Sequence, residues 1–505
     1  MAIRARTAAA ALLAALAAGR APAQEAAVSP PLAPDHWAVL AAGRAEALGL
    51  APGYFPAQRT VPRAAVAGAL REAAERAAAV SPAHAALTAG WLARFEEEFA
   101  EHRPDAPASS ALRVLGGHAS AGSFDLRGRL EPAAGIFHLR TDPTPVPDER
   151  GIALGVGGGV AVGRHLSLFA EPRATRSEVA VPRWEAGVGT GRVALSAGRQ
   201  PLGYGSARGG GVVLGAGPPL FRVQVETTRP VRLPGVLRGA GDVAFHTFGT
   251  RLAEARHPGD PWLWGARLAV RPHPRVSVAV NRASIFGGDS MATPTNLRNV
   301  GGMLLGLISE EFENQVVSMD FRWRLPTDRL LPLTAYLEWG ADDAAGSWWR
   351  VPGIVAGAYT PTVPGLPQVA AGVEYATFAV FCCDNPPWYF NASHTGGWVA
   401  GGAPLGHPLA GDGWEAQAYA HGELAGGRLR LDVRGFLRHR EEEGYHLPPR
   451  AGNLLGPDRF GGSRGGVLRA VLRATPRVDL GAAAAAETGR GWSERQIEAS
   501  ATLLF

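Results

Sequence analysis

The sequence contains no lysine, so all 50 of its basic residues are arginine. A guanidinium group forms paired hydrogen bonds with carboxylates and phosphates, which suits arginine to ion pairs inside a protein and to acidic ligands. The chain has only two cysteines, Cys382 and Cys383. Because a disulfide between neighbouring residues is strained, we expect two free thiols. This cysteine usage excludes a disulfide framework and a cysteine-based zinc site.

Beyond its N-terminal segment the sequence lacks any run of about 20 apolar residues, which excludes a helical membrane anchor. A shorter apolar run, Ala8 to Ala18, follows Arg4 and Arg6. Ala21-Pro22-Ala23 then supplies the small residues of a cleavage site, so residues 1–23 are predicted to be a secretory signal peptide. An exported chain without a helical anchor is periplasmic, secreted or a β-barrel.

An excess of one charge sign is also nearly absent. The formal net charge is +5, but Arg4, Arg6 and Arg20 lie in the predicted signal peptide, which holds no acid. The rest of the chain therefore carries 5 − 3 = +2. This balance gives little reason to expect a nucleic-acid partner.

The last ten residues, QIEASATLLF, alternate between apolar and mostly polar side chains. Successive side chains of a strand point to opposite faces, and one face would hold only apolar residues: Ile497, Ala499, Ala501, Leu503 and Phe505. Bacterial outer-membrane barrels end in such strands, with the apolar face toward lipid. A soluble edge strand could alternate in the same way, and the predicted export favours the barrel. We also expect the strand ending at Phe505 to be bound by the machinery that inserts barrels.

The period of two recurs from about Ala111 onward. It is clearest in Val317–Leu325, in Leu333–Trp339, and in the segments around Leu431 and Leu480. The polar faces of these segments carry charges, which would be costly against the core of a sandwich. In a large barrel these charges would face a wet lumen.

The connectors between the predicted strands also alternate. Short turns are predicted at Arg271–Arg275, Pro326–Arg329, Ala425–Gly427 and Thr475–Arg477. Long linkers are predicted at Ser284–Asn314, Cys383–Gly413 and Arg438–Gly465. Counting back from the terminal strand, each short turn falls at the periplasm and each long linker outside, as in outer-membrane barrels. We expect about 18 strands from Pro132 to the end, and a range of about 16 to 20 because Ala111–Arg129 also resembles a strand.

Three helices are predicted before the barrel. The first runs from about Asp35, as N-cap, to Leu48, and the second begins near Thr60. The third has Ser81 as N-cap and Pro82 at its first position, with one apolar face formed by Leu87, Trp91, Phe95 and Phe99. The predicted domains are a linker at 24–34, a periplasmic helical bundle at 35–105 and the barrel at 111–505. The fold class is thus mainly β, a large antiparallel transmembrane β-barrel with a small N-terminal α-helical domain.

In this order of parts the chain resembles the capsule assembly Wzi family. The motif-like stretches that carry the resemblance are Gly198-Arg199-Gln200 before the glycine-rich Gly203–Gly217, Asn281–Gly288, Asn314-Gln315 with Asp320, Tyr336-Leu337-Glu338 with Asp342-Asp343, and Trp388-Tyr389 with His394 and Leu405-Gly406-His407. The resemblance implies an outer-membrane barrel with a periplasmic helical bundle. It further implies a lectin-like protein that holds capsular or extracellular polysaccharide on the cell.

Sugar recognition uses planar polar groups for hydroxyls and aromatic faces for C–H surfaces. The Cys383–Gly413 linker offers both kinds, and its glycan candidates are Trp388, Tyr389, Asn391, His394 and Trp398. The alternative is an aromatic girdle residue or two within a self-packed loop. Arg438–Tyr445 could meet an acidic polysaccharide, although a solvated loop of mixed charge explains it better.

The luminal charges allow two interpretations. They could form the constriction of a porin-like diffusion channel or, as the resemblance favours, a network that braces the lumen. The residues are Asp320, Arg322, Arg324, Glu338, Arg430, Asp432 and Arg434. We identify no G-x-S-x-G nucleophile elbow, in which a strand turns into a helix at the serine, and no H-E-x-x-H pair, so we predict no catalytic residues, no metal and no cofactor. A barrel hydrolase acting on lipid or envelope polymer is the third hypothesis.

Overall fold

The computed structural model describes residues 28–103, 112–127 and 150–505, except for residues 164, 176–177, 216, 218, 254–255, 307–311, 329, 343–351, 379–387, 392, 401–402, 410, 412 and 442–459. The predicted signal peptide, both cysteines and Pro132 lie outside the described residues.

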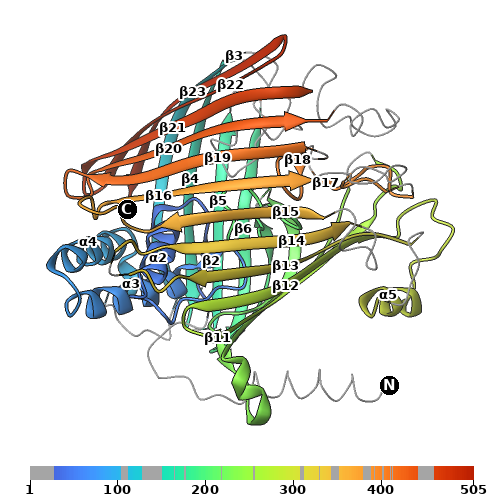
Figure 1. Ribbon diagram of the computed structural model, residues 1–505, viewed down its shortest axis with the longest axis horizontal. Coiled ribbons are helices and arrows are strands. Elements are labelled where there is room, and N and C mark those ends of the chain that lie inside the picture. Colours follow the sequence, from blue (N-terminus) through green and yellow to red (C-terminus); the bar gives the residue numbers. More distant parts are fainter. Residues whose placement is uncertain are drawn as a thin grey trace.

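Eighteen long antiparallel strands form one sheet in the described chain (Figure 1). Strand β23 pairs with β3, and β8 pairs with β10, so the hydrogen bonding runs around a closed barrel. The predicted barrel and its range of strand numbers are confirmed. The strands are β3 (Leu112–Arg127), β4 (Arg150–Val162), β5 (Leu166–Thr175), β6 (Val179–Thr190), β7 (Val193–Gln200), β8 (Leu220–Thr227), β10 (Asp242–Arg251), β11 (Trp262–His273), β12 (Val276–Phe286), β13 (Glu313–Arg324), β14 (Thr334–Asp342), β15 (Gly353–Thr360), β16 (Val369–Phe378), β19 (Gly413–Leu424), β20 (Leu429–Arg440), β21 (Gly461–Thr475), β22 (Val478–Gly489) and β23 (Trp492–Leu504).

The number of strands agrees with the prediction, but strand β3 corrects the predicted start of the barrel at Pro132. The segment Ala111–Arg129 contains β3, which is the first strand of the barrel and lies between β23 and β4. Its register with β23 begins at His118 opposite Leu504. The eighteen strands therefore begin at Leu112, before Pro132. The pairing of β3 with the last strand, β23, shows that β3 belongs to the barrel wall.

The alternation of faces agrees with the prediction. On β13, Met319 and Phe321 are exposed on the outward face, whereas Ser318 and Asp320 are buried on the luminal face. On β23, the odd-numbered residues from 497 onward are exposed. The exposed side chains belong to the surface that meets lipid.

The two ends of the barrel differ in their connectors. Most of the turns at one end are short, as between β21 and β22, where the backbone of Arg477 accepts a hydrogen bond from Leu504. The β13–β14 connection at residues 325–333 is longer than predicted. Figure 1 shows the helices α2, α3 and α4 and the C-terminus at this end, and α5 (Leu297–Leu304), β17 (Val399–Ala400) and β18 (Ala403–Pro404) at the other. Among the described residues, no helix is long and apolar enough to cross a membrane.

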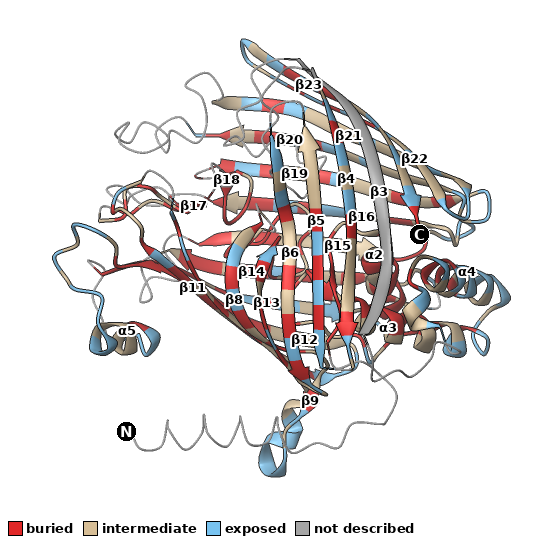
Figure 2. Ribbon diagram, turned by 180° about the vertical axis from the view of Figure 1, so that it is seen from behind, coloured by how far each residue is buried: buried red, intermediate tan, exposed pale blue. Residues whose placement is uncertain are grey.

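The helical bundle consists of α2 (Trp37–Ala47), α3 (Arg63–Ala77) and α4 (Pro82–Glu98). The prediction for α4 is confirmed: Ser81 is the N-cap, Pro82 follows, and Trp91, Phe95 and Phe99 are buried. Figure 2 shows that α2 is buried along most of its length, whereas α4 keeps exposed residues. The bundle core joins α2, α3 and α4 into one apolar cluster.

Two helix starts differ from the prediction. Helix α2 is capped by His36, whose Nδ1 accepts a hydrogen bond from Ala38 N, so Asp35 is not the N-cap. Asp35 instead pairs with Arg469 of the barrel. Helix α3 begins after Pro62, because Val61–Pro62 (β2) pairs with Pro31–Leu32 (β1). This pairing also brings part of the expected linker into the bundle. The remaining short elements are β9 (Val231–Arg232), η1 (Ala100–His102) and η3 (Gly235–Ala240).

Candidate functional site

The helical bundle sits in one mouth of the barrel and is held there by an ion pair with β13. Arg322 Nη2 lies 2.5 Å from Glu46 Oε2, and its Nη1 donates to Glu46 Oε1 at 2.7 Å. Arg324 Nη1 donates to the backbone carbonyl of Glu46 at 3.4 Å. Two of the predicted luminal arginines therefore bind the bundle, and Glu46 is the partner that sequence reasoning missed.

Arg44 of α2 attaches the bundle to the turn between β15 and β16. Its guanidinium is almost fully buried and donates to three backbone carbonyls, those of Pro361, Pro367 and Gln368. It also lies 5.3 Å from the ring centroid of Trp91. Burial lowers the pKa of Arg44 from its usual range. Nothing in the sequence around Arg44 signals this role, because its partners are backbone atoms more than 300 residues away.

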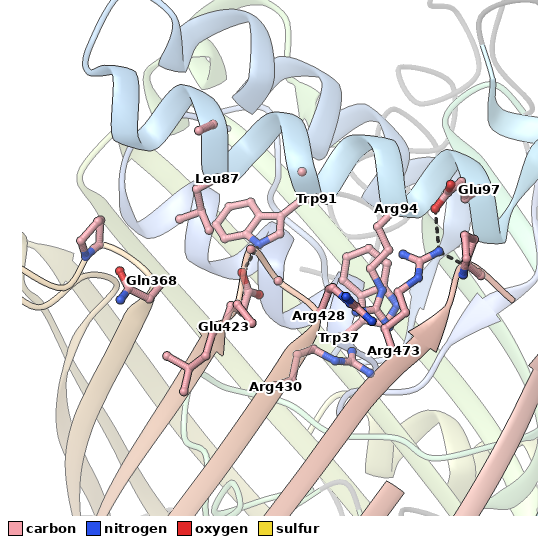
Figure 3. A pocket seen from close by; sticks show the side chains of 18 of the residues that line it. Trp37, Leu87, Trp91, Arg94, Glu97, Gln368, Glu423, Arg428, Arg430 and Arg473 are labelled. Carbon is pink, nitrogen blue, oxygen red and sulfur yellow. Dashed lines mark hydrogen bonds and ion pairs between the residues drawn. The ribbon is translucent and has the colours of Figure 1, made fainter. Parts of the chain in front are cut away.

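A groove of about 760 Å³ runs between α4 and the turns at this end of the barrel (Figure 3). Trp91 Nε1 donates to Glu423 Oε2 at 2.5 Å on one side of the groove. Arg94 and Arg430 also line the groove, and both lie close to Asp479, at 2.8 Å and 3.6 Å. Carboxylates of the barrel strands therefore bind the indole of Trp91 and the guanidinium of Arg94 on α4. Arg430 takes part in this contact through Asp479.

The remaining predicted luminal charges have partners on the barrel strands. Asp320 accepts hydrogen bonds from Arg267 and Asn281, and Ser318 donates to Glu338 at 2.7 Å. Asp432 lies 2.7 Å from His421, and Arg434 lies over the ring of Phe436. The predicted residues thus pair mostly with residues that were not predicted as part of the network, namely Arg267, Asn281, Ser318 and His421. The sequence signal for these partners was only an inward position on an alternating strand.

The glycine-rich loop of residues 201–217 enters the lumen from the other end. Glu374 of β16 accepts hydrogen bonds from the backbone N–H groups of Arg208 at 2.7 Å and Gly209 at 2.8 Å. Tyr336 and Gln417 each donate to the same carboxylate at 2.6 Å. One buried acid on the wall thereby accepts two hydrogen bonds from the loop and two from side chains of β14 and β19, which orient it. Sequence reasoning treated this stretch only as a loop or bend and missed Glu374.

The loop of residues 388–409 packs on the glycine-rich loop and forms an apolar core inside the barrel. Trp398 is 0% exposed, and its Nε1 donates to Val213 O at 2.9 Å. Tyr389, which is 3% exposed, donates through its hydroxyl to Val212 O at 2.7 Å. The cluster extends to Trp388 and to the barrel wall. No Cβ fits on Gly215, because it would overlap Gly406 O where the two loops cross.

All five glycan candidates therefore come together in one loop, and all five are buried. Asn391 accepts hydrogen bonds from the backbone N–H groups of Ser393 and His394, which stabilises the turn. Burial, aided by the charge of Arg256, lowers the pKa of His394 to about 4, so its ring is neutral at pH 7. In this arrangement the aromatic rings contact protein, and a role in glycan binding stays a prediction.

Three segments meet at the outer end of the barrel, and their described residues form what we call the outer lid: 251–261, 287–296 and 388–409, the last of which also contributes to the core. Arg256 joins two of them by donating to the carbonyls of Val399 at 2.7 Å and Gly397 at 2.6 Å. The backbone N–H of Asp289 donates to Gly259 O at 2.7 Å and joins the third. The exposed polar residues of the outer lid include Arg251, His257, Asp289 and Ser290.

The geometry suits binding better than catalysis. The outer lid offers exposed donors and acceptors on a packed support, which is the chemistry that sugar hydroxyls require. The run Arg438–Tyr445 is described only to residue 441, and its Arg438 is buried beside Glu415 and Glu487. Among the described residues, no group of three or more His, Cys, Asp or Glu side chains could hold a metal ion.

The family model of the capsule assembly protein Wzi matches residues 155–457, which is more than half of the chain. Escherichia coli Wzi, described as an outer-membrane, carbohydrate-binding β-barrel involved in group 1 capsule assembly, matches in structure with a TM-score of 0.70 and 14% sequence identity, covering 94% of this chain and 99% of that chain. Pseudomonas aeruginosa OpdQ matches with a TM-score of 0.46 and 9% identity, over 78% of this chain and 98% of that one. No curated protein sequence matches the chain.

Proposed function

The chain belongs to the family of the capsule assembly protein Wzi, and on this premise we propose that it attaches capsular or extracellular polysaccharide to the outer membrane. The protein is an outer-membrane β-barrel, and its role in this proposal is to bind the polymer without changing it chemically. The polysaccharide reaches the protein from outside, at the outer lid.

The observation that carries the proposal is the filling of the lumen from both ends. A barrel of eighteen strands is wide enough for an aqueous channel. Here the helical bundle occupies one mouth, and the loops of residues 201–217 and 388–409 form a dry core toward the other. This packing supports a binding role over the porin-like alternative, which needs an open lumen.

The outer lid is the surface where we place the polysaccharide. Its exposed groups include a guanidinium, an imidazole, a carboxylate and a hydroxyl, from Arg251, His257, Asp289 and Ser290. The buried Trp388, Tyr389 and Trp398 pack loop 388–409 against the core and so support these exposed groups. A preorganised surface loses less conformational entropy when a ligand binds, so the buried aromatics contribute to affinity through rigidity.

The test is binding of the detergent-folded protein to the host's own extracted surface polysaccharide, measured as a titration. We expect saturable binding that weakens about tenfold or more in a His257→Ala, Asp289→Asn double variant, since lost hydrogen bonds cost about 1 kcal/mol each. Arg428→Ala is the matched control, because Arg428 is exposed at the opposite end. Absence of saturable binding in a preparation shown to be folded would refute the proposal.

Conductance in planar bilayers separates attachment from diffusion. We expect no stable ohmic current from the intact protein. A steady open-channel current whose ion preference changes in Arg322→Ala or Arg430→Ala would favour the porin-like function. Deletion of residues 24–105 sharpens the test, because a diffusion channel should then conduct more strongly.

A further inference from the structure

The outward face of the barrel carries an ion pair between Arg282 and Glu313 near the outer ends of two strands. Without a cover, this pair would lie close to the lipid. Arg282 of β12 shares its face with Val280, which is exposed two residues away. Glu313 of β13 shares its face with the exposed Met319. Arg282 Nη2 lies 3.2 Å from both carboxylate oxygens of Glu313. Glu313 is only 1% exposed, so something covers it on the outside of the barrel.

The cover is the β12–β13 connection, which contains α5. Met303 of α5 is fully buried and packs with Phe286 and Phe312. Arg282 Nη1 donates to the carbonyl of Leu304 at 3.5 Å, which ties the end of the helix to the wall. Figure 1 shows α5 at the end of the barrel opposite the helical bundle. The helix thus shields a charge pair on the wall with its own apolar side.

The side of α5 that faces away from the wall carries exposed leucines beside one arginine. Leu297 and Leu304 lie one above the other, seven residues apart, and are 92% and 44% exposed. Leu305 adds a third leucine at 66%, and Arg298 is the exposed cation beside them. A short helix that turns leucines and one arginine outward matches an amphipathic helix lying at a membrane surface.

The height of α5 on the barrel agrees with this placement. Arg282 lies two residues beyond the lipid-facing Val280, which is about 7 Å along a strand at roughly 3.3 Å per residue. Trp262 is exposed at the outer start of β11, opposite Phe286 of β12. Exposed aromatic residues at this level form the girdle of outer-membrane barrels. The exposed leucines therefore continue the lipid-facing surface of the barrel.

We propose that α5 is an interfacial helix whose exposed leucines enter the outer leaflet of the outer membrane. Its ligand is a lipid with acyl chains and an anionic headgroup, which Arg298 contacts. The helix would hold the outer lid at a fixed height above the membrane, because residues 287–296 of the lid lead directly into it. This surface is separate from the proposed polysaccharide site.

A nitroxide label on α5 tests the proposal. Both cysteines are replaced by serine, and single labels are placed through Leu304→Cys, Leu297→Cys, Val280→Cys and Glu75→Cys. Val280 is the lipid-facing reference, and Glu75 of α3 is an exposed reference outside the barrel. The protein is reconstituted in bilayers containing lipopolysaccharide, and collisions with oxygen and with a water-soluble nickel complex are compared.

We expect the labels at Leu304 and Leu297 to resemble the Val280 label, with collisions with oxygen exceeding those with nickel several-fold. A ratio like that of Glu75 would overturn the proposal, because it would place α5 in water. Low collision rates with both reagents would also overturn it, because they would show that protein or polysaccharide covers the helix. The Leu297 label keeps the test valid if the Leu304 variant fails to fold.

Discussion

The helical bundle meets the barrel chiefly through arginines, whereas the outer loops meet it through apolar rings and backbone hydrogen bonds. Arg44, Arg94 and Arg322 each join an acid or carbonyl across the contact between the bundle and the barrel. Trp398 and Tyr389 instead place rings in the lumen and donate to carbonyls there. Both regions close the same barrel, but they depend on different forces.

This difference determines how each contact should respond to conditions. Ion pairs near water weaken with salt and with protonation, so the bundle should be the part that loosens first. The outer core depends on volume and apolar area, so it should tolerate salt and fail when a ring is removed. Substitutions and acid should therefore affect the two regions differently.

The largest effect is expected for Trp398→Ala in the outer core. Removal of a fully buried ring costs about 3–5 kcal/mol, and here it also leaves Val213 O without its donor. Hydrogen exchange of residues 388–409 should rise strongly while exchange of the bundle stays unchanged. Trp262→Ala is the matched control, because Trp262 is 43% exposed on the outer wall. Equal exchange in the two variants would contradict an apolar core at this end.

The next effect is expected for Arg44→Ala at the contact between the bundle and the barrel. A hydrogen bond that involves a charged group contributes about 1.5–3 kcal/mol net of the exchange with water, and here the contribution acts on the attachment of the bundle. Loss of the guanidinium should free the bundle and raise its cleavage by protease several-fold, with the barrel intact. Arg76→Ala is the control, since Arg76 is 54% exposed on α3 and pairs with Glu72 of the same helix. If both variants are cleaved like the native protein, Arg44 does not anchor the bundle.

The bundle should also lose stability in acid. Burial alone would raise the pKa of Glu98, but the charge and hydrogen bond of His36 and the indole of Trp37 lower it to about 2. A carboxyl whose pKa is lower in the folded state stabilises the fold fully at pH values above its unfolded pKa of about 4.3. This contribution disappears as the pH falls through the folded pKa of about 2. Protease sensitivity of the bundle should rise across this range, and Glu98→Gln should flatten the profile. An unchanged profile in that variant would assign the acid sensitivity to other groups.

The smallest effect is expected for Arg473→Ala. Arg473 Nη2 lies 2.6 Å from Glu97, but the Glu97 side chain is 49% exposed. Exposed ion pairs contribute at most about 1 kcal/mol and are screened by salt. Bundle release should change little, and raising the salt concentration should remove the change. An effect as large as that of Arg44→Ala would mean that exposed pairs also hold the bundle.

Much of the fold followed from local patterns. The alternation in β13 and β23 predicted which residues face outward, and Ser81 with Pro82 predicted the start of α4. The site was less predictable. The aromatic loop was identified from Trp388 to Trp398, yet nothing in its composition showed that its rings point into the lumen. The partner of Arg322 was missed, because Glu46 lies 276 residues away and on a helix.

The sequence alone determined the barrel, its inward and outward faces and the order of its parts, because a period of two and the turn residues act over neighbouring positions. What fills the lumen follows from contacts between residues that are far apart in the sequence. Glu374 holds a loop more than 160 residues before it, and Trp398 reaches Val213 on that loop. An inward position on a strand shows only that a side chain faces the lumen. Its partner depends on how the barrel closes, which brings distant residues together.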